Sequence, residues 1–171
     1  MAATSNGPAC PVPTDSQQFL SWGDRSLYTP APGVSPDNFS GAGWVLSGGA
    51  KLINTVLADG STGTVLDLPP GGSATSPVMC VESGEPIARQ ITRMVGTSAS
   101  SNATTFYVTP AGSSKLGSGM PVLGQTGWAL SPPDNIYPGS GTESVYFTYQ
   151  SHAKVGDLLV YDLYVDPKMA R

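Results

Sequence analysis

Aromatic side chains are the residues of this sequence whose binding chemistry is easiest to assign. Flat aromatic faces stack on sugar rings, and the Trp N–H and Tyr O–H groups keep one polar contact. Trp22 and Trp128 stand beside glycines, whereas Tyr146 and Tyr164 fall in two strand-like stretches near the end of the chain. We take these four residues as candidate ligand-binding residues, with core packing as the alternative for each.

Residues that carry hydrolytic or redox chemistry are sparse. His152 is the only histidine, and the sequence contains no Gly-x-Ser-x-Gly motif, no phosphate-binding loop and no dinucleotide fingerprint. A glycosidase would need an acid and a base from carboxylates that stand at expected turns and strand edges, namely Asp59, Asp67, Glu82, Glu85 and Glu143. We therefore expect a protein that is not an enzyme.

The two cysteines, Cys10 and Cys80, differ in their surroundings. Cys10 lies in a proline-rich arm, residues 1–15, whereas Cys80 lies in an apolar strand-like stretch. A bridge between them would pin the arm to the domain and close a loop of about 70 residues, worth about 4 kcal/mol in the chain-entropy model. We predict this disulfide, which favours an oxidising compartment; two buried thiols are the alternative.

Charge and hydropathy argue against two classes of partner. The net charge is −4, and the 8 Lys and Arg residues are scattered along the chain, so we expect neither nucleic-acid binding nor attraction to an anionic membrane. The sequence contains no apolar run of about 18 residues, so we predict no membrane span. The N-terminus also has no signal-peptide pattern, which fits a mature exported protein with an added Met1 or a protein assembled in the cytoplasm.

The elements that must position the candidate residues are strands. Gly and Pro supply 21 and 16 of the 171 residues, a composition typical of short strands joined by turns. Residues 157–167 carry apolar side chains on both faces, so they predict a long central strand that is covered on both sides. The alternation places Tyr161 and Leu163 on one face of this strand and Asp162 and Tyr164 on the other.

About nine strands in all predict one antiparallel β-sandwich over residues 16–171. Residues 16–28 are expected to form a first strand and turn, and residues 29–38 and 110–119 to form loops. Residues 86–95 fit a helix or a strand, and we predict a strand from the β-rich surroundings. The remaining strands are expected at residues 44–46, 51–57, 64–68, 74–81, 104–108, 128–130 and 144–149.

Two stretches resemble a known family. Asn38–Ala50, which contains Gly-Trp-Val-Leu-Ser-Gly-Gly-Ala, resembles the opening of jelly-roll carbohydrate-binding modules, and Tyr161–Pro167 resembles their last strand. The chain is also similar to uncharacterised exported actinobacterial proteins that share the motifs at Phe19–Asp24, Gly43–Ala50 and Leu163–Pro167. The resemblance implies an all-β, galactose-binding-like jelly roll.

The resemblance also implies a function. It implies a non-enzymatic extracellular module that binds a glycan or another cell-surface ligand. It further implies a structural calcium ion at Asp162, although Ser40 and Leu163 stand where the family carries carboxylates. The alternative is a structural subunit of a surface fibre or of a virion surface, because the low charge and an arm at residues 1–15 suit contacts with copies of the same chain.

Overall fold

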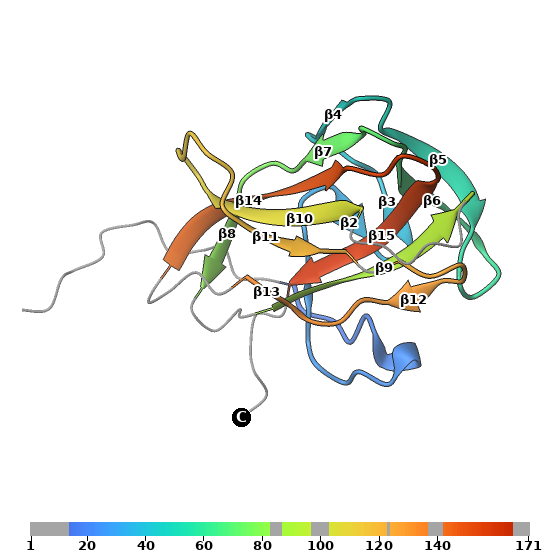
Figure 1. The fold of residues 1–171 in the computed structure, drawn as a ribbon. Helices are drawn as coiled ribbons and strands as arrows, with labels where there is room; N and C mark the ends of the chain where they lie inside the picture. The colour runs from blue at the N-terminus through green and yellow to red at the C-terminus, as the bar shows by residue number, and fades with distance from the viewer. Residues whose placement is uncertain (1–13, 83–86, 97–102, 123, 137–141, 166–171) are drawn as a thin grey trace, which may run out of the picture.

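The chain folds into two antiparallel β-sheets that pack face to face (Figure 1). The computed structural model describes residues 14–82, 87–96, 103–122, 124–136 and 142–165. Within these residues the regular elements are strands and one short 3-10 helix, η1 (Leu20–Trp22). The predicted all-β sandwich is therefore confirmed.

The first sheet has seven strands and holds the C-terminal strand at its centre. Its order is β12 (Ala129–Leu130), β9 (Ile87–Val95), β15 (Asp157–Val165), β6 (Thr62–Leu68) and β5 (Lys51–Val56). Two short strands extend it, because β1 (Thr29–Pro30) pairs with β15 and β13 (Asp134–Asn135) pairs with β9.

The second sheet has six strands and faces the first. Its order is β11 (Ser118–Pro121), β10 (Thr104–Pro110), β14 (Thr142–Ser151), β7 (Ser73–Thr75) and β4 (Val45–Ser47), with β8 (Met79–Glu82) on β14. A separate two-stranded ladder joins β2 (Val34–Ser35) to β3 (Asn38–Phe39).

The core lies between the two sheets and is rich in aromatic rings. Phe106 stacks on Phe147 with ring centroids 5.4 Å apart, and Trp44 stacks on Tyr149 at 6.3 Å. The indole N–H of Trp44 donates to the carbonyl oxygen of Pro32 at 2.6 Å. Trp44 is therefore a core residue, with its one polar group satisfied inside the protein.

The prediction that residues 157–167 form a central, two-sided strand is confirmed for β15. Every residue from Leu158 to Val165 is buried, and β15 pairs with β9 along one edge and with β6 and β1 along the other. Pro167 lies outside the described residues.

The predicted alternation along β15 is wrong beyond Tyr161, because the strand contains a β-bulge. Tyr161 pairs with Ile91, and Tyr164 pairs with Arg89, so two residues of β15 oppose one residue of β9. Asp162, inside the bulge, has a φ of 52°, a conformation that Asp tolerates better than most residues. Directly opposed residues share a face of a sheet, so Tyr161 and Tyr164 lie on the same face.

Several predicted boundaries also differ from the structure. Residues 16–28 contain η1 and a single bridge from Ser16 to Tyr28 instead of a strand, because Phe19 and Tyr28 pack inward together. The expected loops at residues 29–38 and 110–119 contribute β1, β2, β3 and the start of β11 through two- to four-residue pairings. Residues 86–95 are a strand, as predicted, over Ile87–Val95.

The predicted arm and its disulfide are described only in part. Cys80 lies in β8, whereas Cys10 and residues 1–13 lie outside the described residues. Asp15, which follows them, accepts a hydrogen bond from the Thr29 hydroxyl at 2.9 Å and so fixes the entry of the chain beside β1. The bridge, and the division into an arm and a domain at residues 16–171, stay predictions.

We expect peptide mapping without reductant to recover Cys10 and Cys80 in one cross-linked peptide. Reduction should lower the free energy of unfolding by up to about 4 kcal/mol, because the unfolded chain regains the entropy of a loop of about 70 residues. A Cys10→Ser/Cys80→Ser double variant, whose stability should not respond to reductant, is the control. Two thiols that react with iodoacetamide in the unfolded, unreduced protein would contradict the prediction.

Candidate ligand-binding site

The segment around η1 packs on the outer face of the seven-stranded sheet (Figure 1). The Phe19 ring meets the rings of Tyr28 and Tyr164 edge to face, at centroid distances of 4.9 and 5.9 Å. Such aromatic pairs contribute about 0.5–1.5 kcal/mol each beyond their buried area. The β15 bulge makes this packing possible, because it turns Tyr164 toward the outer face.

A half-buried ion pair between Asp24 and Arg89 holds the other end of this segment. Asp24 accepts hydrogen bonds from the Tyr28 hydroxyl at 2.6 Å, from the Ser26 N–H at 2.9 Å and from Arg89 at 2.6 Å. Burial acts to raise the pKa of Asp24, but these hydrogen bonds outweigh it and hold the pKa at about 2. Asp24 is therefore charged at neutral pH, and Arg89 ties it to β9.

Trp22, the last residue of η1, forms one wall of a pocket with a volume of about 370 Å³. The residue after it, Gly23, ends the helix with a φ of 86°, a conformation that glycine adopts without a steric penalty. The pocket lies where η1, the turns after β2 and β5 and the β15 bulge meet, and its walls include Gln18, Trp22, Asp37, Asp59, Tyr161 and Asp162. An aromatic ring therefore faces polar groups across a small cavity.

Asp162 is the buried polar centre of this pocket. Its Oδ2 accepts a hydrogen bond from the Gln18 side-chain amide at 2.7 Å, and its Oδ1 accepts one from the Asp37 backbone N–H at 2.9 Å. Burial raises the pKa of Asp162, these two hydrogen bonds lower it, and the charge of Asp37 raises it again, to about 7. Asp162 thus joins the segment before η1 and the β2–β3 turn to the central strand.

Asp59 is one of two exposed carboxylates of the pocket, with Asp37. Both Ser61 donors that the structure shows, the hydroxyl at 2.6 Å and the backbone N–H at 2.9 Å, end on Oδ1 of Asp59. The Ser61 hydroxyl, followed by its backbone N–H, lowers the pKa of Asp59, so this group is charged at neutral pH.

The calcium ion implied by the family resemblance does not fit the residues at Asp162. Calcium needs six to eight oxygen ligands, but the two oxygens of Asp162 already accept hydrogen bonds from the Gln18 amide and the Asp37 N–H. Among the described residues, no group of three or more His, Cys, Asp or Glu side chains is arranged to hold a metal ion. The expectation of a metal role for Asp162 is therefore corrected to a hydrogen-bonded structural role.

The structure separates the four aromatic residues chosen from the sequence. Trp22 lines the pocket, and Trp128 packs beside it, with its ring edge to face on Tyr161 at 4.9 Å and its N–H donating to the Val56 carbonyl at 3.0 Å. Tyr146 lies on the second sheet between buried Val145 and Phe147, so it points to that sheet's outer face. Trp22 and Tyr146 therefore belong to opposite sides of the sandwich.

The prediction that Tyr164 binds a ligand is wrong, because its ring is not available to a ligand. It is 1% exposed and lies under Phe19, with ring centroids 5.9 Å apart. The sequence pattern placed it in a strand that is covered on both sides, on the face opposite Tyr161. The bulge that turns it beneath the η1 segment has no clear sequence signal except an aspartate in an apolar run. It is a packing residue in this fold.

Sequence reasoning missed Gln18, Asp37 and Tyr161 as pocket residues, and it considered Asp59 only as a glycosidase carboxylate. These residues come from four segments far apart in the chain, and no fixed spacing connects them. The available signal was the family resemblance, which singled out Asp162, a residue of the same pocket, as a metal ligand.

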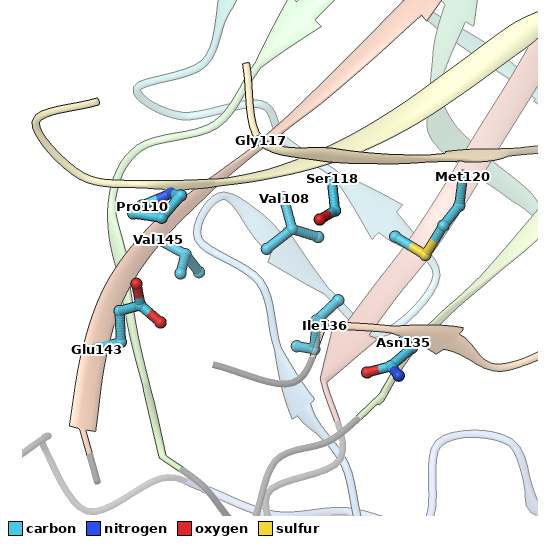
Figure 2. A pocket seen from close by; sticks show the side chains of 9 residues that line it. All are labelled: Val108, Pro110, Gly117, Ser118, Met120, Asn135, Ile136, Glu143 and Val145. Carbon is cyan, nitrogen blue, oxygen red and sulfur yellow. The ribbon is translucent and has the colours of Figure 1, made fainter. Parts of the chain in front are cut away.

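A larger cavity of about 680 Å³ opens beside β10, β11, β13 and β14 (Figure 2). Figure 2 shows apolar side chains of Val108, Met120, Ile136 and Val145 around it, with Glu143 at one side. None of the residues that line it is aromatic, and Glu143, considered from the sequence only as a glycosidase carboxylate, is the one lining residue that the sequence analysis named. We therefore place the candidate site at the Trp22 pocket despite its smaller volume.

Comparison with known proteins shows the fold. No protein-family model matches the sequence, and no curated protein matches it. The N-terminal CBM22-1–CBM22-2 tandem domain of Xyn10C from Paenibacillus barcinonensis is 14% identical, with 98% of this chain and 48% of that chain covered and a TM-score of 0.52. Arabinose-bound MgGH51 α-L-arabinofuranosidase is 18% identical, with 75% and 23% covered and a TM-score of 0.50.

A third structure, the CBM22-1 xylan-binding domain of the same Xyn10C, is 16% identical, with 75% of this chain and 88% of that chain covered and a TM-score of 0.49. The match to the tandem domain confirms the predicted jelly-roll β-sandwich and, at the level of the fold, the resemblance to carbohydrate-binding modules. At these identities the likeness concerns the fold alone. In the part of the chain that the structure describes, no helix is long and apolar enough to cross a membrane.

We expect Asp162→Asn to weaken the pH dependence of stability. Asp162 has a pKa of about 7 in the folded protein, whereas an aspartate ordinarily has a pKa of 3.8. The stability that proton binding at Asp162 contributes is therefore largest below pH 4 and falls as the pH rises to about 7. Asparagine keeps an acceptor for the Asp37 N–H and tolerates a positive φ. In urea unfolding from pH 4 to 8, the free energy of unfolding of the variant should change less steeply with pH than that of the wild type. The difference in slope should correspond to at most one bound proton.

Asp59→Asn is the matched control, because Asp59 lies in the same pocket and its pKa is lowered instead of raised. Asp67 and Asp134, with pKa values raised to about 6 by burial, act in the same direction as Asp162. The difference between variant and wild type is therefore the quantity to measure. Parallel stability curves for wild type and Asp162→Asn would contradict the assignment.

Proposed function

We propose that this protein is a non-catalytic, glycan-binding module whose binding site is the Trp22 pocket. The observation that carries the proposal is the half-buried Trp22 ring on the wall of a pocket of about 370 Å³ that also presents carboxylate and amide groups. Small-ligand sites typically combine such a concave shape with an apolar wall and a few convergent polar groups. Sugars match this combination, since they have an apolar ring face and a rim of hydroxyl groups.

In the proposed binding mode, the Trp22 ring and the carboxylates contact different parts of the sugar. The apolar face of a sugar stacks on Trp22, and its hydroxyl groups donate hydrogen bonds to Asp59 and Asp37, which are both exposed at the pocket. Hydrogen bonds to charged acceptors are shorter and stronger than those to neutral acceptors. Asp162, which is buried beneath the pocket surface, supports the site because its hydrogen bonds fix the Gln18 side chain and the Asp37 backbone.

Binding without catalysis suits the carboxylates of the pocket. A glycosidase needs an acid and a second carboxylate that both reach the scissile bond. Asp162, whose pKa of about 7 would suit an acid, is 0% exposed, and both of its oxygens accept protein hydrogen bonds. The likeness of the fold to that of carbohydrate-binding modules supports the same conclusion.

The proposed setting is outside the cell, where glycans are presented. The predicted Cys10–Cys80 disulfide supports this setting, because such bridges persist in oxidising compartments. The acidic balance of the chain, with a net charge of −4, suits a ligand recognised through hydroxyl groups and stacking more than one recognised through phosphates.

We expect Trp22→Ala to abolish binding on a glycan array and to weaken calorimetric affinity for the best ligand at least tenfold. A buried aromatic anchor at the centre of a site typically contributes 2 kcal/mol or more. Asp59→Asn should weaken affinity less, because the amide oxygen still accepts a hydrogen bond. Leu20→Ala is the matched control, since Leu20 lies in the same 3-10 helix, is 50% exposed and is not part of the pocket wall.

Two outcomes would count against this proposal. If Tyr146→Ala abolishes binding and Trp22→Ala does not, the site lies on the outer face of the second sheet. If the wild-type protein binds no glycan and light scattering shows a defined oligomer or filament, the alternative of a structural subunit is favoured. Thermal unfolding of each variant must show the wild-type transition for the comparison to hold.

A further inference from the structure

Trp22 lines two neighbouring depressions, not one. The second depression has a volume of about 520 Å³ and is shallower, and its walls include Trp22, Arg25, Tyr28, Ile87, Arg89 and Pro133. The first depression is the Trp22 pocket described above, on the side of Asp59 and Tyr161. Trp22 is the one residue that lines both of them.

Strand β9 shows how the two depressions are arranged. Ile87, Arg89 and Ile91 alternate along β9 and so point to the same outer face. Ile91 belongs to the first depression, whereas Ile87 and Arg89 belong to the second. Because a strand rises about 3.3 Å per residue, the span from Ile91 to Ile87 is about 13 Å. The depressions therefore follow one another along β9, with Trp22 between them.

We propose that this site binds an oligosaccharide, with the chain lying along the outer face of β9 and sugar units on either side of Trp22. The inference rests on the proposed function and deepens it, because it names a glycan chain instead of a single terminal sugar as the ligand. Each depression falls in the range of about 300–1,000 Å³ that small-ligand pockets occupy, so each has room for a sugar unit.

The two depressions have different polarity. The exposed carboxylates of Asp37 and Asp59 make the first one rich in hydrogen-bond acceptors. In the second one, Arg89 is occupied, because it donates to Asp24 and to the Ser131 carbonyl. Arg25 is exposed at the rim of the second depression, and its guanidinium offers up to five N–H donors.

This difference gives the bound chain a preferred direction. A sugar unit in the first depression donates its hydroxyl protons to carboxylates, whereas the unit in the second depression accepts hydrogen bonds from Arg25. The accepting group is either a hydroxyl oxygen or the carboxylate of a uronic acid, which an arginine binds in two-pronged fashion. In both cases, the second sugar unit supplies an oxygen atom that accepts a hydrogen bond from Arg25.

The test is the dependence of affinity on chain length, measured by calorimetry. The probes are mono- to hexasaccharides of xylose, glucose, galactose and galacturonate. We expect affinity to rise at least tenfold between the monosaccharide and the trisaccharide of the preferred series. Arg25→Ala should remove most of this gain and leave the monosaccharide affinity unchanged, whereas Asp59→Asn should weaken every chain length.

Arg93→Ala is the matched control for Arg25→Ala, because Arg93 lies on β9, along which the glycan is proposed to bind, and lines neither depression. It should keep the full gain with chain length. A preference for galacturonate chains that disappears in Arg25→Ala identifies a uronate as the acceptor, and an equal loss for neutral chains identifies a hydroxyl. Both results support the proposal.

The possible failures are distinguishable. If the wild-type protein binds none of the probes and no glycan on the array, the proposed function fails, and this inference fails with it. If it binds a monosaccharide as tightly as longer chains, or if Arg25→Ala leaves the gain with chain length intact, the oligosaccharide inference is overturned while glycan binding stands.

Discussion

The buried carboxylate of Asp162, in the bulge of the central strand, is the constraint on which the candidate site depends. An ionised carboxylate in the interior costs several kcal/mol unless hydrogen bonds compensate for lost water. Gln18 and the backbone of Asp37 provide those hydrogen bonds, so two segments far from β15 in the sequence must pack against it. The same bulge shifts the alternation of β15 and brings Tyr161 and Tyr164 to one face.

Because of the bulge, the outer face of the seven-stranded sheet supports the segment around η1. Tyr164 gives Phe19 and Tyr28 a surface to pack on, and the ion pair between Asp24 and Arg89 fixes the far end of the same segment. These contacts place Trp22 before any ligand arrives. A binding ring held in this way loses little conformational entropy on binding, which is a general source of affinity.

The sandwich separates two surfaces that sequence reasoning had grouped together. Tyr146 alternates with core residues of the six-stranded sheet, whereas Trp22 covers the outer face of the seven-stranded sheet. Since the packed core lies between them, the two residues cannot contact one ligand. The larger cavity in Figure 2 is apolar at Val108, Met120 and Val145, so its chemistry differs from that of the Trp22 pocket.

The sequence by itself determined the β-sandwich and the central place of β15, because alternation and turn residues are local properties. The strand at residues 87–95 followed from the β-rich surroundings and not from its own pattern, which fits a helix equally well. Only the tertiary structure decided which face Tyr164 occupies and which residues surround Trp22. The bulge depends on hydrogen bonds from Gln18 and Asp37, which are 144 and 125 residues away from Asp162. Pairings at such separations follow from how the sheets pack, and no local pattern encodes them.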